Sequence, residues 1–242
     1  MSRCHVDRLL AITVACWATA GTVYATEPQS VVFTGRDGVE VTGSLYLPDR
    51  QPAPAVVLLP MMGRSRADWD VTAQKLAEAG IAALAIDFRR NGGPRLGADG
   101  AQSGDYSDLV IDGDAARAYL ASRPDVSAGR IGMAGASIGA SVVVLSAASD
   151  PQVRSLALLS PSLEYRGLRI EQPLRKYGSR PALLVVSSED PYALRSARAM
   201  VSMGDGAREL RVLSGAGHGT VMLSREPDLS SVLVDWFLRT LL

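Results

Sequence analysis

The stretch Gly135-Ala136-Ser137-Ile138-Gly139 follows a run of apolar residues and precedes a segment with helical spacing. Residues 130–136 have the pattern of a buried strand and residues 137–148 that of a helix, so the serine falls at a strand-to-helix junction. A sharp turn there requires small residues two positions before and two positions after the serine, and both positions are glycine. Ser137 would then project above the sheet, over a helix N-terminus that favours negative charge. The pattern predicts a nucleophile, although a serine that only caps the helix would fit it as well.

Outward from this turn, strand-like and helix-like segments alternate along the chain. Short continuous apolar runs are typical of strands buried on both faces. The alternation predicts right-handed crossovers and a doubly wound, mainly parallel sheet, with an antiparallel pair at its N-terminal edge around the turn Arg36-Asp37-Gly38. One α/β domain over residues 26–242 would account for the pattern. We expect strands at 30–33, 39–47, 55–59, 81–88, 130–136, 153–159, 182–187 and 209–213, and helices at 66–79, 106–122, 137–148, 193–203 and 229–241.

The charge balance excludes some classes of partner. The 242 residues include 25 acidic and 25 basic side chains, so the formal net charge is zero. No long run of one sign interrupts this balance. A global field that would attract nucleic acid or an anionic membrane surface is therefore not expected.

The first 25 residues have the order of a secretory signal peptide. A basic start with Arg3 and Arg8 is followed by an apolar run over 9–20 and by Val23-Tyr24-Ala25, with small residues at the outer positions. The apolar run is shorter than the ~20 residues of a membrane-spanning helix, which disfavours an uncleaved anchor. We expect cleavage after Ala25 and export, to the periplasm or the medium. The alternative is lipoprotein processing, with the chain anchored at Cys16.

Cleavage after Ala25 limits the chemistry of the remaining chain. Both cysteines, Cys4 and Cys16, leave with the signal peptide, and so does His5. A disulfide framework, a cysteine nucleophile and a cysteine-ligated metal are thereby excluded. His218 remains as the single histidine of the expected mature chain.

A candidate acid follows the buried run at 182–187. Asp190 and Glu189 both lie at the expected carboxyl end of this strand, where functional groups gather in open parallel sheets. We take Asp190 as the acid and keep Glu189 as its rival. An aspartate before Pro191 is also typical of a helix N-cap, so the pattern fits either role for Asp190.

The candidate base follows the last expected strand. His218 lies in the loop Ser214-Gly215-Ala216-Gly217-His218-Gly219, whose glycines would let it reach across the sheet to the serine. A single loop histidine is usually an ordinary surface residue. Here the order serine, acid, histidine is that of the nucleophile-elbow architecture, and the three residues together predict a catalytic triad.

These motifs resemble the α/β-hydrolase superfamily, and within it the dienelactone-hydrolase-like and prolyl-oligopeptidase-like serine hydrolases. The resemblance covers nearly all of the expected mature chain. It rests on the elbow at 135–139, the acid and base segments at 188–191 and 217–219, and Ile86-Asp87-Phe88-Arg89, where the superfamily often has Asp-x-Arg-Gly. Dienelactone hydrolases themselves use a cysteine nucleophile, so Ser137 points instead to ester-type chemistry.

The superfamily's usual His-Gly after the third strand is replaced here by Pro60-Met61-Met62-Gly63. We expect this loop to supply one of the two backbone N–H groups of an oxyanion hole, and the residue after the nucleophile, Ile138, to supply the other. Alignment suggests Met62 as the loop donor, with Met61 as a close alternative. Because the donors are backbone groups, the loss of the His-Gly side chains need not abolish the hole. The methionines also suit adaptable packing around a pocket floor.

The expected function is hydrolysis of a small or medium carboxylic ester through an acyl-enzyme, with no metal or organic cofactor. The segment 162–181 is too short for a large cap, which predicts an open cleft that Tyr165 and Arg166 would line. Basic residues in the loop after the fourth strand would attract an acidic substrate, or would be solvated loop charges with an internal pair to Asp87. These residues are Arg89, Arg90 and Arg95, with Asn91-Gly92-Gly93 between them.

Two other functions fit the same residues. The first is a serine peptidase or amidase, although such peptidases usually carry an added propeller domain for which this chain has no room. The second is a non-catalytic binding member of the fold, whose usual sign is a missing triad residue. All three triad positions are filled here.

Overall fold

The computed structural model describes residues 27–89, 106–204 and 206–242. Within these ranges one eight-stranded sheet has the order β1-β2-β4-β3-β5-β6-β9-β10. In this order the six strands β4, β3, β5, β6, β9 and β10 pair in parallel, and β1 and β2 add an antiparallel edge. The predicted doubly wound sheet with an antiparallel N-terminal edge is confirmed. Its strands are β1 (Gln29–Thr34), β2 (Glu40–Tyr46), β3 (Ala53–Leu59), β4 (Ala82–Ile86), β5 (Val126–Ala136), β6 (Val153–Leu159), β9 (Ala182–Ser187) and β10 (Arg208–Leu213).

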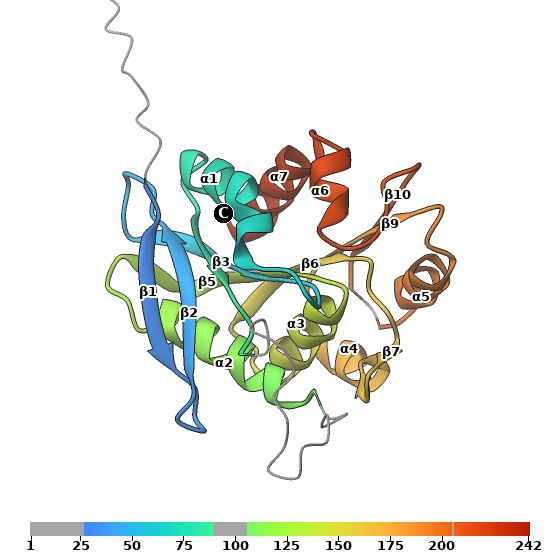
Figure 1. Cartoon of the computed structure of the whole chain (residues 1–242), viewed down its shortest axis with the longest axis horizontal. Helices are drawn as coiled ribbons and strands as arrows, with labels where there is room; N and C mark the ends of the chain where they lie inside the picture. Colours follow the sequence, from blue (N-terminus) through green and yellow to red (C-terminus); the bar gives the residue numbers. More distant parts are fainter. Residues whose placement is uncertain (1–26, 90–105, 205) are drawn as a thin grey trace, which may run out of the picture.

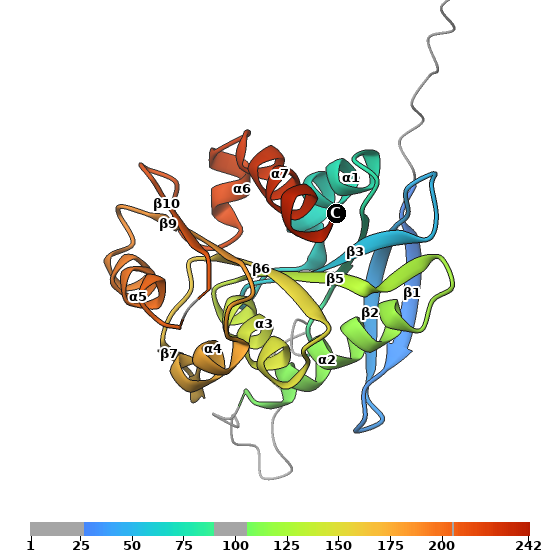
Figure 2. The ribbon, with the colours of Figure 1, turned by 180° about the vertical axis from the view of Figure 1, so that it is seen from behind.

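Helices cover both faces of the sheet (Figures 1 and 2). On one face lie α1 (Asp70–Glu78), α6 (Val221–Arg225) and α7 (Leu229–Leu241), and on the other lie α2 (Asp108–Ala121), α3 (Ile138–Ser149), α4 (Glu171–Tyr177) and α5 (Pro191–Val201). Two apolar clusters fill the space between the sheet and these layers. Every residue of β3 and β4 is buried, which explains why these strands appear as continuous apolar runs in the sequence.

The structure contains elements that the sequence pattern did not indicate. The segment between β6 and β9 folds into a hairpin of β7 (Glu164–Tyr165) and β8 (Leu168–Arg169), followed by α4. Arg166 and Gly167 form its turn with positive φ angles of 53° and 83°. Two-residue strands and helices of five to seven residues are too short to show a period, so they escaped prediction. The helix expected over 66–79 is divided into a 3₁₀ turn, η1 (Arg66–Trp69), and α1.

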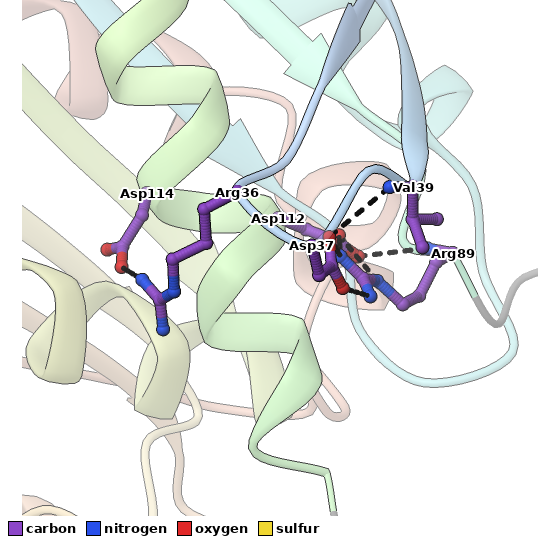
Figure 3. A network of polar contacts seen from close by, with 6 residues as sticks. All are labelled: Arg36, Asp37, Val39, Arg89, Asp112 and Asp114. Carbon is purple, nitrogen blue, oxygen red and sulfur yellow. Dashed lines mark hydrogen bonds and ion pairs between the residues drawn. The ribbon is translucent and has the colours of Figure 1, made fainter.

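Arg89 forms the centre of a buried ion-pair network (Figure 3). Its side chain is 4% exposed and pairs with Asp112, which is fully buried, and with Asp37 in the β1–β2 turn. Asp87 pairs with Arg66 at 2.6 Å. Arg89 is therefore paired internally, in line with one of the two alternatives, and its partners are Asp112 and Asp37. Sequence spacing could not reveal Asp112, because α2 reaches β4 only through the fold. The predictions for Arg90, Arg95 and Asn91-Gly92-Gly93 lie outside the described residues.

The predicted signal peptide and the alternative lipid anchor at Cys16 also lie outside the described residues. In the part of the chain that the structure describes, no helix combines the length and the apolar character needed to cross a bilayer.

Candidate active site

Ser137 stands in a strained turn between β5 and α3. Its φ is 53° and its ψ is −116°, a conformation that a residue with a side chain adopts only when its surroundings impose it. The flanking glycines allow the turn to close. A Cβ on Gly135 would collide with the backbone of Gly139, and a Cβ on Gly139 would come within 2.5 Å of the Pro60 carbonyl oxygen. Both glycines are therefore required by close backbone approach.

Asp190 follows β9 and begins α5. Its Oδ1 accepts the Ala193 N–H at 3.1 Å and Pro191 occupies the first helical position, so the residue is an N-cap. Its Oδ2 lies 2.5 Å from Nδ1 of His218. One carboxylate thus fits both roles that the sequence suggested.

His218 lies in the loop after β10, where Gly215, Gly217 and Gly219 all have positive φ. This backbone turns the imidazole across the carboxyl edge of the sheet, and its Nε2 lies 2.8 Å from Oγ of Ser137. The imidazole side chain is 45% exposed, against 15% for that of Asp190. Ser137, His218 and Asp190 therefore form one continuous hydrogen-bonded row, although they come from three separate loops.

Glu189, the rival acid, points elsewhere. Its carboxylate accepts the hydroxyls of Ser187 at 2.6 Å and Ser188 at 2.9 Å, and the backbone N–H of Gly215 at 2.7 Å. These bonds, that from Ser187 first, lower the pKa of Glu189 to about 2. Glu189 thus binds the start of the histidine loop, and its hydrogen bonds leave the imidazole to Asp190.

Two further contacts hold the end of the histidine loop, and sequence reasoning missed both. Oγ of Ser160, at the end of β6, accepts the Gly219 N–H at 2.9 Å. The hydroxyl of Thr220 donates to Asp68, whose carboxylate is also bound by Arg64 through two hydrogen bonds. Partial burial alone would raise the pKa of Asp68, but the bonds from Arg64 and Thr220 lower it. The only sequence signal for Ser160 is its place directly after a buried strand.

The two candidate oxyanion-hole donors lie on adjoining segments. Ile138 is the first residue of α3, whose first N–H groups have no partner within the helix. The loop at 60–63 packs against the elbow through Pro60 and Gly139. No hydrogen bond joins the N–H groups of Ile138, Met62 and Met61 to an acceptor among the described residues. Met62 packs against one apolar cluster and Met61 against the other, and both are half-buried, in line with the packing interpretation. Met61 is kept as the alternative donor.

A model of the dienelactone hydrolase family matches residues 41–230, which include the elbow, the acid and the histidine. The chain belongs to the dienelactone hydrolase family. The predicted family resemblance is therefore confirmed, and with it the coarser statement that the chain is a member of a hydrolase family.

Solved structures support the same fold for this family member. It is similar to a dienelactone hydrolase from Anabaena variabilis, with a TM-score of 0.76, 21% identity, and coverage of 90% of this chain and 100% of that one. It also resembles the esterase domain of a Rhodothermus marinus protein, with a TM-score of 0.70, 18% identity, and coverage of 89% and 100%. An acetyl xylan esterase from Paenibacillus sp. R4 gives a TM-score of 0.72 and 18% identity, with coverage of 93% and 87%. At these identities the likeness shows the α/β-hydrolase fold alone.

Curated relatives carry a different name. The chain is 30% identical over 208 residues to a Mycobacterium tuberculosis protein named "Putative phosphoribosyl transferase". The match covers 83% of this chain but only 44% of that protein. The chain thus spans less than half the length of this relative.

The hairpin residues expected near the cleft form an aromatic and cationic group. The guanidinium of Arg166 lies 5.6 Å from the ring centroid of Tyr165 and 5.8 Å from that of Tyr106, two residues before α2. Arg166 therefore joins the β7–β8 hairpin to the segment that leads into α2. The contact of Tyr165 and Arg166 with a substrate stays a prediction, and so does the open cleft. No group of three potential metal ligands occurs within the described ranges.

Proposed function

We propose that this member of the dienelactone hydrolase family is a serine esterase, which cleaves a carboxylic ester through an acyl-enzyme on Ser137. The observation that carries the proposal is the hydrogen-bonded row of three side chains. Oγ of Ser137 lies 2.8 Å from Nε2 of His218, and Nδ1 of His218 lies 2.5 Å from Oδ2 of Asp190. Both distances suit proton transfer between nucleophile and base, and orientation of the base by the acid.

In the proposed mechanism His218 removes the Ser137 proton as Oγ attacks the ester carbonyl. Asp190 holds the imidazole with Nδ1–H toward its carboxylate and stabilises the imidazolium that forms. His218 then protonates the leaving alkoxide. Water enters, gives a proton to His218 and attacks the acyl carbonyl. The bond to Oγ then breaks, His218 returns the proton to Oγ, and the acid leaves.

The negative charge on the tetrahedral oxygen needs donors fixed in advance. The N–H of Ile138 and that of Met62 are the proposed pair, with Met61 as the alternative to Met62. Support comes from the helix N-terminus at Ile138 and from the close packing of the 60–63 loop against Gly139. Backbone donors remain whichever side chains occupy the loop.

The proposed substrate is a small or medium ester. The segment between β6 and β9 forms only a short hairpin and one seven-residue helix, which agrees with a site that lacks a large cap. Export through the segment 1–25 remains part of the proposal, and it would bring the enzyme to esters outside the cytoplasm.

Activity-based labelling tests the nucleophile. The protein is treated with a fluorophosphonate probe and with p-nitrophenyl esters of graded chain length, beside Ser137→Ala and His218→Ala. We expect labelling and turnover by the wild type only, with kcat/KM of either variant lower by about 10³-fold or more. A matching p-nitroanilide series measures amide cleavage, which we expect to be slower than ester cleavage.

Ser141→Ala is the matched control. Ser141 lies one turn further along the same helix, is fully buried, and its Oγ has no partner among the described residues. It should label and turn over like the wild type. A wild type that neither labels nor hydrolyses any ester would refute the esterase, and labelling of Ser137→Ala would refute this nucleophile.

A further inference from the structure

The residue directly after β6 combines burial with backbone strain. Ser160 is 1% exposed and has a φ of 48°. This left-handed conformation is unfavourable for a residue with a Cβ but not for glycine. Glycine would therefore be the better residue for the backbone alone. The presence of serine suggests that its hydroxyl is needed at this point.

The hydrogen bonds of Leu159 and Ser160 join three parts of the site. The Leu159 carbonyl oxygen accepts the N–H of Ser137 at 2.8 Å. The Ser160 N–H donates to the Val185 carbonyl oxygen in β9, also at 2.8 Å. Oγ of Ser160 accepts the N–H of Gly219 at 2.9 Å. Two adjacent residues thus bind the backbone of the nucleophile, the strand that precedes the acid, and the residue after the histidine.

The strand order explains this position. β6 lies between β5, which ends at the elbow, and β9, which leads to Asp190. Its carboxyl end is consequently below the centre of the hydrogen-bonded row. The bond from Gly219 is buried on both sides, since Gly219 and Ser160 are both buried, so water does not compete with it.

The Gly219 bond has a direct effect on the neighbouring histidine. Gly217 and Gly219 flank His218, both with positive φ, and glycine backbone is intrinsically free to rotate. The bond to Ser160 removes that freedom on the C-terminal side of the histidine. A displacement of the imidazole by about 1 Å would be enough to slow a reaction that depends on its alignment by about 100-fold.

We propose that Ser160 is a positioning residue for His218, which fixes the imidazole against Ser137 by binding the N–H of Gly219. The inference rests on the proposed role of His218 as the base. The hydrogen bonds of Ser160 go to the backbone of Gly219 and Val185 and not to the three side chains of the row. Ser160 acts on them through the backbone of Gly219.

Two substitutions separate the hydroxyl from the backbone strain. Ser160→Gly removes both, and Ser160→Ala removes the hydroxyl but keeps the Cβ. For each we expect a decrease in kcat for p-nitrophenyl esters of about 10- to 100-fold, with KM changed by less than about threefold. Ser160→Gly should unfold at no lower a temperature than the control described next.

Ser155→Ala is the matched control. Ser155 lies in β6, toward the end of the strand that is far from the site, and is fully buried. Its hydroxyl oxygen accepts a hydrogen bond from the hydroxyl of Thr240 in α7. Loss of that bond should lower the unfolding temperature but leave kcat within about twofold of the wild type, because Thr240 is in α7 and its hydroxyl bonds to Ser155 and the Trp236 carbonyl oxygen. A loss of kcat in Ser160→Gly without a larger loss of stability identifies positioning rather than a general structural role.

A second measurement does not depend on activity. The ¹H resonance of the His218 Nδ1–H, bonded to Asp190, is recorded in full-length protein with ¹⁵N-labelled histidine and assigned by comparison with His218→Gln. We expect a sharp low-field signal in the wild type and Ser155→Ala, and a broadened or missing signal in Ser160→Gly.

The two measurements distinguish the possible failures. If the wild type hydrolyses esters, but Ser160→Gly keeps its kcat within twofold and its His218 signal unchanged, the positioning role is wrong and the esterase stands. If the wild type neither labels nor hydrolyses, the proposed function fails, and the His218 signal alone decides the positioning role.

Discussion

Oδ2 of Asp190 lies 2.5 Å from Nδ1 of His218, while Oδ1 of the same carboxylate caps α5 through the N–H of Ala193. The helix cap therefore holds the carboxylate in the orientation that the imidazole requires. Such a capping bond restricts rotation of the Asp190 side chain before any substrate binds. Preorganisation of the proposed acid is thus a consequence of how α5 begins.

Asp190→Asn separates these two roles. Asparagine is as good an N-cap as aspartate, so the free energy of unfolding should change by less than about 0.5 kcal/mol. It cannot accept the Nδ1–H in the same way or stabilise the imidazolium, so kcat should decrease by roughly 10³- to 10⁴-fold. Asp190→Ala should lose the cap as well, at a cost of about 1 kcal/mol. Ester turnover and urea denaturation measure the two effects, and equal activity of Asp190→Asn and wild type would exclude Asp190 as the acid.

Gly139→Ala tests the close approach of the elbow to the 60–63 loop. The new Cβ would lie 2.5 Å from the Pro60 carbonyl oxygen, so the loop must move. We expect a loss of about 1–3 kcal/mol in the free energy of unfolding, and a decrease in kcat because the loop carries a proposed oxyanion donor. Gly129→Ala is the control, since no atom lies within 4 Å of its Cβ position. Wild-type stability and kcat in Gly139→Ala would contradict this packing.

The side chains of the row could be predicted from the sequence because the fold needs little information to bring them together. Ser137, Asp190 and His218 each directly follow a strand or lie in the loop after one, and the carboxyl ends of parallel strands share one edge of the sheet. Local pattern and strand order were therefore sufficient. The choice between Asp190 and Glu189 as the acid depended on the direction of each side chain, which the sequence left open.

The supports of the site could not be predicted in this way. Ser160 and Gly219 are 59 residues apart, and Thr220 and Asp68 are 152 residues apart. Neither pair has a local pattern, because each contact exists only after separate loops have packed. The same reason explains why the sequence did not indicate Asp112 as a partner of Arg89.

Glu189→Gln should show a pH-dependent effect on stability. The pKa of Glu189 is lowered from its ordinary value of 4.5 to about 2, so its charged form stabilises the folded protein above about pH 4.5. That contribution is lost as the pH falls from 4.5 toward 2. The difference in unfolding temperature between wild type and Glu189→Gln should therefore be constant near neutral pH and shrink in this acidic range. Ser187→Ala removes the strongest of its hydrogen bonds, so in this background the loss should be smaller and should be complete at a higher pH. A difference that does not vary between pH 6 and pH 2 would contradict the assigned role of Glu189.

Arg89→Met should be among the most destabilising substitutions at a charged residue of this chain. It leaves Asp112 fully buried without its cation, and removal of one partner from a buried ion pair costs about 3–5 kcal/mol. The change also releases Asp37 in the β1–β2 turn (Figure 3). Urea denaturation measures the cost. Arg239→Met is the control, because its pair with Glu209 is exposed and should be worth less than about 1 kcal/mol. The double variant Arg89→Met, Asp112→Leu should recover part of the loss, since no charge then remains buried. If Arg89→Met costs no more than Arg239→Met, the network does not hold together the β1–β2 turn, the segment after β4 and α2.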